Sequence, residues 1–66
     1  ESVMRAVLRA GAYELKKRKD IPARVVITEY VDVAGAFFGR EDSGVVNAVL
    51  DRLARGFRAE EFEPRA

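Results

Sequence analysis

The chain has 66 residues, a formal net charge of +1, and neither cysteine nor histidine. A chain this small holds one domain at most, because it can bury only about 60% of the surface that its unfolded form exposes. Without cysteine and histidine, disulfides, thiolate metal sites and the usual nucleophile–base pairs cannot form. We therefore expect a cytoplasmic, non-catalytic protein without a cofactor or metal.

The composition predicts a folded chain. Hydrophobic residues make up 48% of it and charged residues 35%, a balance typical of a packed core with a solvated surface. No apolar run approaches the roughly 20 residues that cross a membrane, and the N-terminus does not resemble a signal peptide. The chain starts at Glu1 with amphipathic sequence following at once, so we expect that a preceding part of the protein is missing.

The first predicted element is a helix from Ser2 to Lys19, with Ser2 as its N-cap. Its apolar residues recur at helical spacing: Met4, Leu8, Ala12 and Leu15. The basic run Lys16 to Lys19 falls in the last turn, where cations interact favourably with the helix dipole. This run could also contact phosphates, but we favour the interpretation that it is the solvated end of the helix. Asp20 to Pro22 then breaks the helix, because the residue before a proline disfavours helical angles.

The second predicted helix extends from Pro22 to Phe38. The β-branched run Val25 to Thr28 would also suit a strand, but the longer pattern has the helical period. The side chains expected to pack inward are Val26, Ile27, Tyr30, Val31, Ala34 and Phe37. Tyr30, Phe37 and Phe38 are the bulkiest candidates for the centre of the core. Gly39 follows where a C-terminal cap with positive φ needs a residue without a Cβ.

A third helix is predicted to start with Asp42 or Ser43 as its cap and to end near Gly56. Its expected apolar face consists of Val46, Val49, Leu50 and Leu53, with Phe57 as a further candidate. We expect a flexible tail over residues 58–66, where charged residues predominate. Three amphipathic helices with short connections predict an all-α fold, a three-helix antiparallel bundle over residues 1–57.

Two features could carry chemistry or binding. The pair Glu41–Asp42 could serve acid–base work or bind a hard cation, but acids before a helix also match its positive end, and we favour that interpretation. Phe37 and Phe38 could divide between the core and a binding surface, although two core phenylalanines are the commoner arrangement. The composition alone therefore identifies no site.

Several short motifs, in order and spacing, resemble the C-terminal half of the NusB family. They are Val7-Leu8-Arg9, Ala12-Tyr13-Glu14-Leu15, Asp20-Ile21-Pro22, Val26-Ile27-Thr28-Glu29, Phe38-Gly39, Glu41-Asp42-Ser43 and Val46-Asn47-Ala48-Val49-Leu50-Asp51-Arg52. The resemblance extends from about Val3 to Ala54. The most specific part is Glu41-Asp42-Ser43 ahead of the motif that contains Asn47. One departure is Val45, near which family members present an aromatic residue toward RNA.

The resemblance implies the second subdomain of a NusB-like helical fold and an RNA-binding transcription antitermination or elongation factor. The implied partners are boxA-type RNA, the ribosomal protein NusE and the RNA polymerase elongation complex, with no membrane. The residues that it places toward RNA are Phe37, Arg40, Asp42, Ser43 and Asn47, and those toward a protein partner are Met4 and Arg5. The arginine-rich N-terminal segment that family members contribute to RNA binding is absent from this chain.

Two alternatives stay open. The same helical module forms the RNA-recognition domain of small-subunit rRNA cytosine methyltransferases, although Glu41-Asp42-Ser43 is more typical of the free factor. The acidic segment around Pro64 also resembles the end of a chain rather than a connection to a catalytic domain. The other alternative is a helical adaptor that binds only protein, which predicts binding insensitive to salt.

Overall fold

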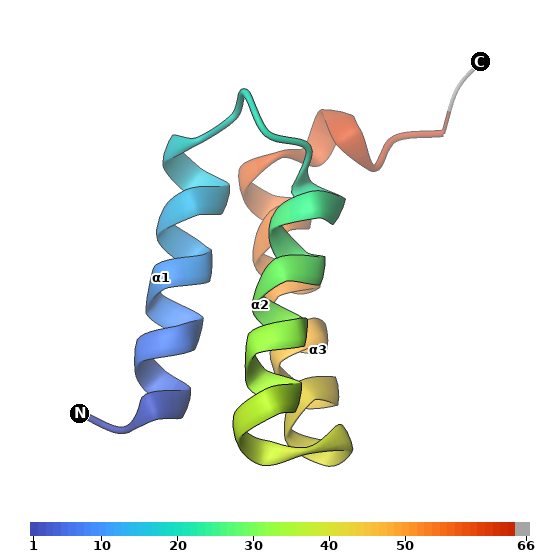
Figure 1. Cartoon of the computed structure of the whole chain (residues 1–66). Helices are drawn as coiled ribbons and strands as arrows, with labels where there is room; N and C mark the ends of the chain where they lie inside the picture. Colours follow the sequence, from blue (N-terminus) through green and yellow to red (C-terminus); the bar gives the residue numbers. More distant parts are fainter. Residues whose placement is uncertain (65–66) are drawn as a thin grey trace.

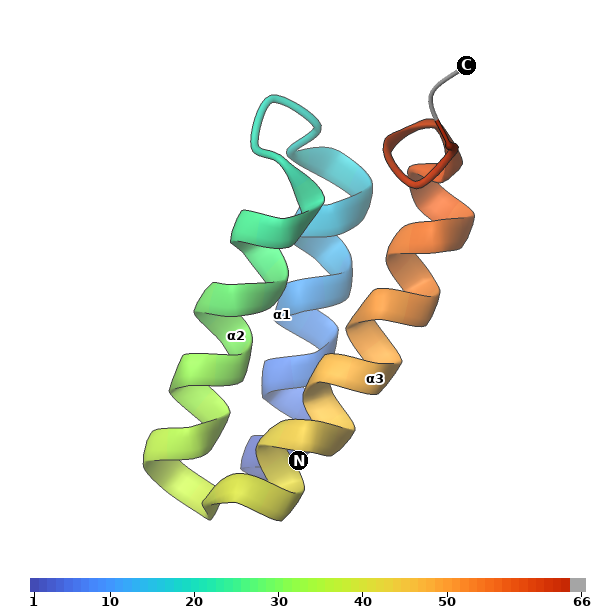
Figure 2. The ribbon, with the colours of Figure 1, turned by 90° about the vertical axis from the view of Figure 1, so that its right-hand side faces the viewer.

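The computed structural model describes residues 1–64. It consists of α1 (Val3–Lys17), α2 (Ala23–Phe38) and α3 (Arg40–Phe57), followed by a 3₁₀ turn, η1 (Ala59–Glu61). The three helices pack side by side and run alternately up and down (Figures 1 and 2). The predicted all-α antiparallel bundle is therefore confirmed. None of the described helices is long and apolar enough to cross a membrane.

Helix α1 begins as its sequence predicts. The Ser2 hydroxyl accepts a hydrogen bond of 3.1 Å from the backbone N–H of Arg5, which satisfies one of the free donors of the first turn. The helix ends at Lys17, two residues before the predicted end, and the N–H of Arg18 closes it by donating to the carbonyl of Glu14. The segment from residue 18 to residue 22 then connects α1 to α2.

Helix α2 ends where the sequence predicts, but α3 begins earlier than expected. Gly39 has a φ of +97°, which confirms the need for glycine at this position. This residue reverses the chain by itself and is also the N-cap position of α3, so α3 begins at Arg40. The predicted capping role of Asp42 or Ser43 is wrong, because both residues already lie inside the helix. The predicted end of α3 near Gly56 is also slightly short, since the helix continues to Phe57.

The core is small and aliphatic. Its buried residues are Val7, Leu15, Ala23, Val26, Ile27, Ala34, Val46, Leu50 and Ala54. The inward position predicted for Phe37 is wrong, because 68% of this residue is exposed, and Phe38 is only partly covered. The hairpin of α2 and α3 extends past the first turn of α1, so no third helix covers the last turn of α2 (Figure 1). Tyr30 is partly buried against the core.

The segment after α3 differs from the expected flexible tail. Arg58 is fully buried, residues 59–61 form the 3₁₀ turn, and Phe62 packs against the core. The last two residues of the expected tail, 65 and 66, lie outside the described residues. The helical bundle therefore includes contacts beyond residue 57, at the end that holds the connection between α1 and α2 (Figure 1).

Candidate nucleic-acid interface

The residues predicted to face RNA gather at the α2–α3 turn, which lies at the lower end of the bundle in Figure 1. Phe37 lies in the last turn of α2, and the others lie near the start of α3: Arg40, Asp42, Ser43 and Asn47. All are exposed except Ser43, which is partly buried. We call these five residues the turn edge. Because Gly39 joins the two helices directly, the backbone holds the turn edge together without a long loop.

Phe37 gives the turn edge an aromatic surface. Its ring centroid lies 6.2 Å from that of Phe38, with the ring planes inclined at 44°. Phe38 is the less exposed of the two, so the neighbouring ring supports Phe37 on one side while most of Phe37 faces solvent. An exposed ring with a supported edge can stack on an unpaired base, because stacking needs only a free aromatic face.

Within the turn edge the charges of Arg40 and Asp42 offset each other, and the neighbouring Glu41 adds a further negative charge. Arg40 is exposed, and no ion pair among residues 1–64 involves it. Glu41 and Asp42 follow in the first turn of α3, where carboxylates interact favourably with the positive end of the helix dipole. Neither carboxylate caps the helix with a side-chain hydrogen bond. The turn edge together with Glu41 therefore offers one cation for phosphate beside two anions that repel it.

Ser43 and Asn47 form a polar stripe on α3. They are four residues apart, which places them on the same side of the helix. The Ser43 hydroxyl donates to the carbonyl of Arg40 at 2.8 Å, so its oxygen keeps the capacity to accept a further hydrogen bond. The Asn47 amide makes no hydrogen bond within residues 1–64 and can both donate and accept. Groups of this kind can read the edges of exposed bases.

The two residues predicted to bind a protein partner lie in the first turn of α1. This turn is at the same end of the bundle as the turn edge (Figure 1). Met4 is partly buried and packs against the core, whereas Arg5 is exposed. Nearby, Arg9 forms an exposed ion pair with Glu1. A partner at this end would therefore meet the Arg5 side chain more fully than that of Met4.

Comparison with known proteins decides the family. The model of the NusB family matches residues 1–55. The chain belongs to the NusB family. No solved structure matches the chain.

The most similar NusB relatives include the transcription antitermination protein NusB of Rhodopseudomonas palustris strain TIE-1, which is 68% identical over 62 residues and is matched over 94% of this chain and 36% of its own length. The protein of the same name from Bradyrhizobium sp. strain BTAi1 is 62% identical over 65 residues, with 98% of this chain and 38% of its own length covered. The protein of this name from Nitrobacter hamburgensis is 66% identical over 62 residues, with 94% of this chain and 39% of its own length covered. The chain thus spans little more than a third of these relatives.

The NusB match includes the whole turn edge and the start of α1, but it ends before Arg58. Sequence reasoning missed the contacts that Arg58 makes, because a charged residue near the end of a chain normally predicts a solvated side chain. It also missed a bond between α1 and α2 in which the Tyr30 hydroxyl donates to the Glu14 carboxylate. Burial, followed by this hydrogen bond, raises the pKa of Tyr30 to about 12. Both features lie away from the turn edge and hold the NusB-like bundle together.

Proposed function

We propose that this chain is part of a transcription antitermination factor and that its turn edge helps to bind boxA-type RNA together with the ribosomal protein NusE. The carrying observation is membership of the NusB family over residues 1–55, a range that includes every residue of the turn edge. The relatives carry the name transcription antitermination protein NusB. In this proposal the chain acts by binding within the RNA polymerase elongation complex and performs no catalysis.

The geometry of the turn edge supports recognition of unpaired bases more than general attraction to phosphate. Phe37 presents an exposed ring for stacking, and Asn47 presents an exposed amide for a base edge. Arg40 can attract a phosphate, but two carboxylates directly follow it in the sequence. Single-stranded RNA with accessible bases fits this arrangement better than a duplex, whose base edges are largely hidden from side chains.

The protein partner would contact the beginning of α1. Arg5 is exposed there, and Met4 offers the part of its side chain that the core leaves uncovered. Because this surface and the turn edge lie at one end of the bundle, RNA and NusE could bind side by side (Figure 1). An exposed arginine at the rim of such a contact affects association rate and salt dependence more than total affinity.

The test is RNA binding by the whole protein, with and without NusE, at two salt concentrations. A boxA RNA and a scrambled RNA of the same length should separate base recognition from phosphate attraction. We expect boxA RNA to bind more tightly than the scrambled RNA, with NusE increasing the difference. Equal binding of the two RNAs would contradict the proposal, and an absence of RNA binding at low salt would instead favour the protein-only adaptor.

The relatives also favour the free factor over the methyltransferase domain that shares this helical module. The relatives named above are antitermination proteins, and none of these names describes a methyltransferase. A methyltransferase would transfer a methyl group from an added methyl donor to ribosomal RNA, which a separate assay with a ribosomal RNA fragment can report. Methylation of a ribosomal RNA fragment by the whole protein would overturn the antitermination proposal.

A further inference from the structure

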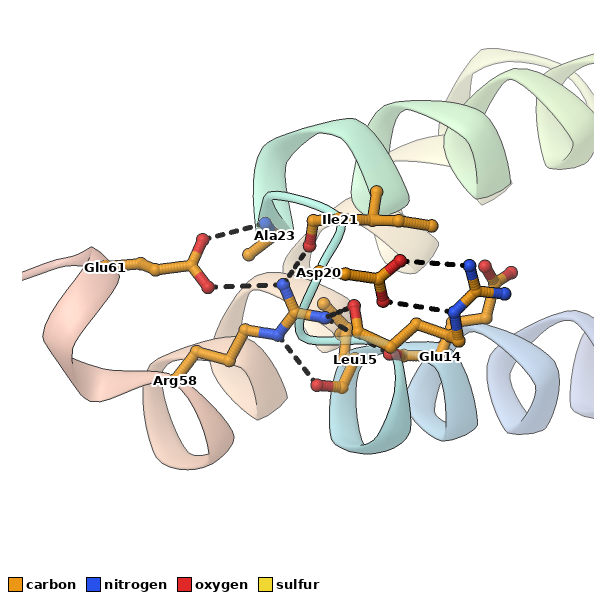
Figure 3. Close-up of polar contacts among 8 residues, drawn as sticks. Glu14, Leu15, Asp20, Ile21, Ala23, Arg58 and Glu61 are labelled. Carbon is orange, nitrogen blue, oxygen red and sulfur yellow. Dashed lines mark hydrogen bonds and ion pairs between the residues drawn. The ribbon is translucent and has the colours of Figure 1, made fainter.

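The Arg58 side chain is fully buried at the C-terminus of α1 (Figure 3). Its guanidinium donates to four backbone carbonyls on α1 and the following connection. The acceptors are the carbonyls of Glu14 at 3.2 Å, Leu15 at 2.7 Å and Arg18 at 2.6 Å, together with that of Ile21. These carbonyls belong to the last turn of α1 and to the connection after it, where few backbone N–H groups remain to serve them. Those of Glu14 and Arg18 each also accept one backbone N–H, from Arg18 and Ile21. Arg58 therefore acts as a C-terminal cap supplied from more than forty residues along the chain.

Arginine is the side chain suited to this position. Its planar guanidinium carries five N–H donors in a fixed arrangement, and it stays charged under all ordinary conditions. Its positive charge also lies at the negative end of the α1 dipole. No buried side-chain nitrogen or oxygen within residues 1–64 lacks a hydrogen-bond partner, so the buried charge of Arg58 is fully satisfied. A lysine would supply only three donors from a single point.

Glu61 caps the next helix from the same segment. One carboxylate oxygen accepts from the N–H of Ala23, the first residue of α2, at 2.9 Å, and the other accepts from the Arg58 guanidinium at 3.2 Å. Pro22 occupies the N-cap position of α2 and provides no side-chain cap of its own. Glu61 therefore supplies the acceptor that the sequence next to α2 lacks, and Lys19 adds a favourable charge from the connection.

The segment is also attached by apolar contact. Phe62 packs against the core, and the Arg55 guanidinium lies 4.7 Å from the centroid of its ring. The contact between a guanidinium and an aromatic face adds to the apolar burial. Arg58, Glu61 and Phe62 thus each contact a different part of the bundle: the end of α1, the start of α2, and the core.

We propose that residues 58–62 form a clasp, a conformational device that closes the bundle by capping α1 and α2 at the same time and so fixes how these helices meet. The clasp lies at the opposite end of the bundle from the turn edge (Figure 1). Opening it would free the α1–α2 connection and the end of α1 while leaving the α2–α3 hairpin joined through Gly39. The clasp therefore adds to the core contacts of Val7 and Leu15 in holding α1 against the other two helices.

The test compares Glu61→Ala with Glu60→Ala in the whole protein by amide hydrogen exchange. Glu60 is the matched control, because it is the preceding residue of the same 3₁₀ turn and makes no side-chain hydrogen bond within residues 1–64. We expect Glu61→Ala to speed exchange of the Ala23 amide at least tenfold and to leave the middle of α3 protected. Glu60→Ala should leave the Ala23 amide at the wild-type rate. Equal rates in wild type and both variants would overturn the clasp.

A second variant keeps the test decisive if removal of the carboxylate affects folding as a whole. Glu61→Gln retains an oxygen that can accept from Ala23 but loses the charge that pairs with Arg58. We expect its Ala23 amide to exchange at a rate between those of wild type and Glu61→Ala. The Arg58 Nε–H provides a separate reading, because a buried donor to the Leu15 carbonyl should exchange far more slowly than exposed arginines. Rapid exchange of this proton in the wild type would contradict the clasp.

Discussion

Leu50 fills the space that a side chain at Gly11 would need. A Cβ built on Gly11 would lie 2.9 Å from the Cδ1 atom of Leu50 and 3.0 Å from its Cδ2 atom. It would also lie 3.3 Å from the ring of Tyr30. Gly11 thus allows α1 to approach both other helices closely. Leu50 is fully buried, so its methyl groups have little room to move away.

Gly11→Ala should therefore destabilise the protein, although alanine favours helix by about 1 kcal/mol over glycine. Overpacking of a core typically costs about 1–3 kcal/mol, so we expect a net loss of up to about 2 kcal/mol after the gain in helix propensity. Gly56→Ala is the control, because it is also within a helix and has nothing within 4 Å of the added Cβ. It should stabilise by up to about 1 kcal/mol. Chemical denaturation of both variants checks this, and a stabilising Gly11→Ala would show that the helices can separate at no cost.

Ile27 and Phe37 lie on the same helix and should respond differently to alanine. Ile27 is buried in the core, so Ile27→Ala should lower the free energy of unfolding by about 2–5 kcal/mol. Phe37 is mostly exposed, so Phe37→Ala should change stability by about 0.5 kcal/mol or less. If Phe37 stacks on a base, its removal should weaken RNA binding by about 1–3 kcal/mol. Thermal melting and RNA titration measure the two effects, and unchanged RNA affinity would remove Phe37 from the turn edge.

Asn47→Ala should weaken the binding of boxA RNA more than the binding of scrambled RNA. A base-edge contact specifies sequence, whereas a phosphate contact only positions the strand. We expect a loss of roughly tenfold on boxA RNA, corresponding to about 1.4 kcal/mol, and little change on the scrambled RNA. Thr28→Ala, which alters an exposed polar residue of α2 away from the turn edge, is the control. The same loss on both RNAs would give Asn47 a structural role instead.

Acid should weaken the fold partly through Glu61. The N–H of Ala23, followed by the Arg58 guanidinium, holds the pKa of this carboxyl below its usual value of 4.5. Because the pKa is lower in the folded state than in the unfolded state, the contribution to stability is fully present above about pH 4.5 and is lost as the pH falls through the folded pKa. Stability should therefore fall less steeply with acid in Glu61→Gln than in wild type.

Urea denaturation at a series of pH values measures this difference. Some acid sensitivity should persist in Glu61→Gln, because hydrogen bonding to Arg18 also lowers the pKa of Asp20. Glu60→Gln is the control and should keep the slope of the wild type. If stability depends on pH in the same way in wild type and in Glu61→Gln, the pKa of Glu61 does not differ between the folded and unfolded states, which would contradict the prediction.

The fold could be predicted from the sequence because its determinants are local. Helical periodicity, the Ser2 cap and the need for glycine at residue 39 each depend on residues close together in the chain. The exposure of Phe37 was missed because periodicity gives a face but not the point where a neighbouring helix stops. The clasp was missed because it joins residues up to 44 positions apart, such as Arg58 and Glu14. The residues of the turn edge follow from family resemblance, because exposed side chains such as those of Arg40 and Asn47 carry no local pattern that indicates RNA.

The single-residue connection at Gly39 makes the spacing between α2 and α3 unusually sensitive to insertions. One residue added inside the first turn of α3 would rotate everything after it by about 100°, because a helix has 3.6 residues per turn. Val46 and Leu50 would then leave the core while polar neighbours turned inward. The connection between α1 and α2, which is several residues long, has more freedom to absorb a length change, but only where the contacts of Arg58 are preserved. Labels and tags placed at the α2–α3 turn should therefore replace existing side chains rather than lengthen the chain.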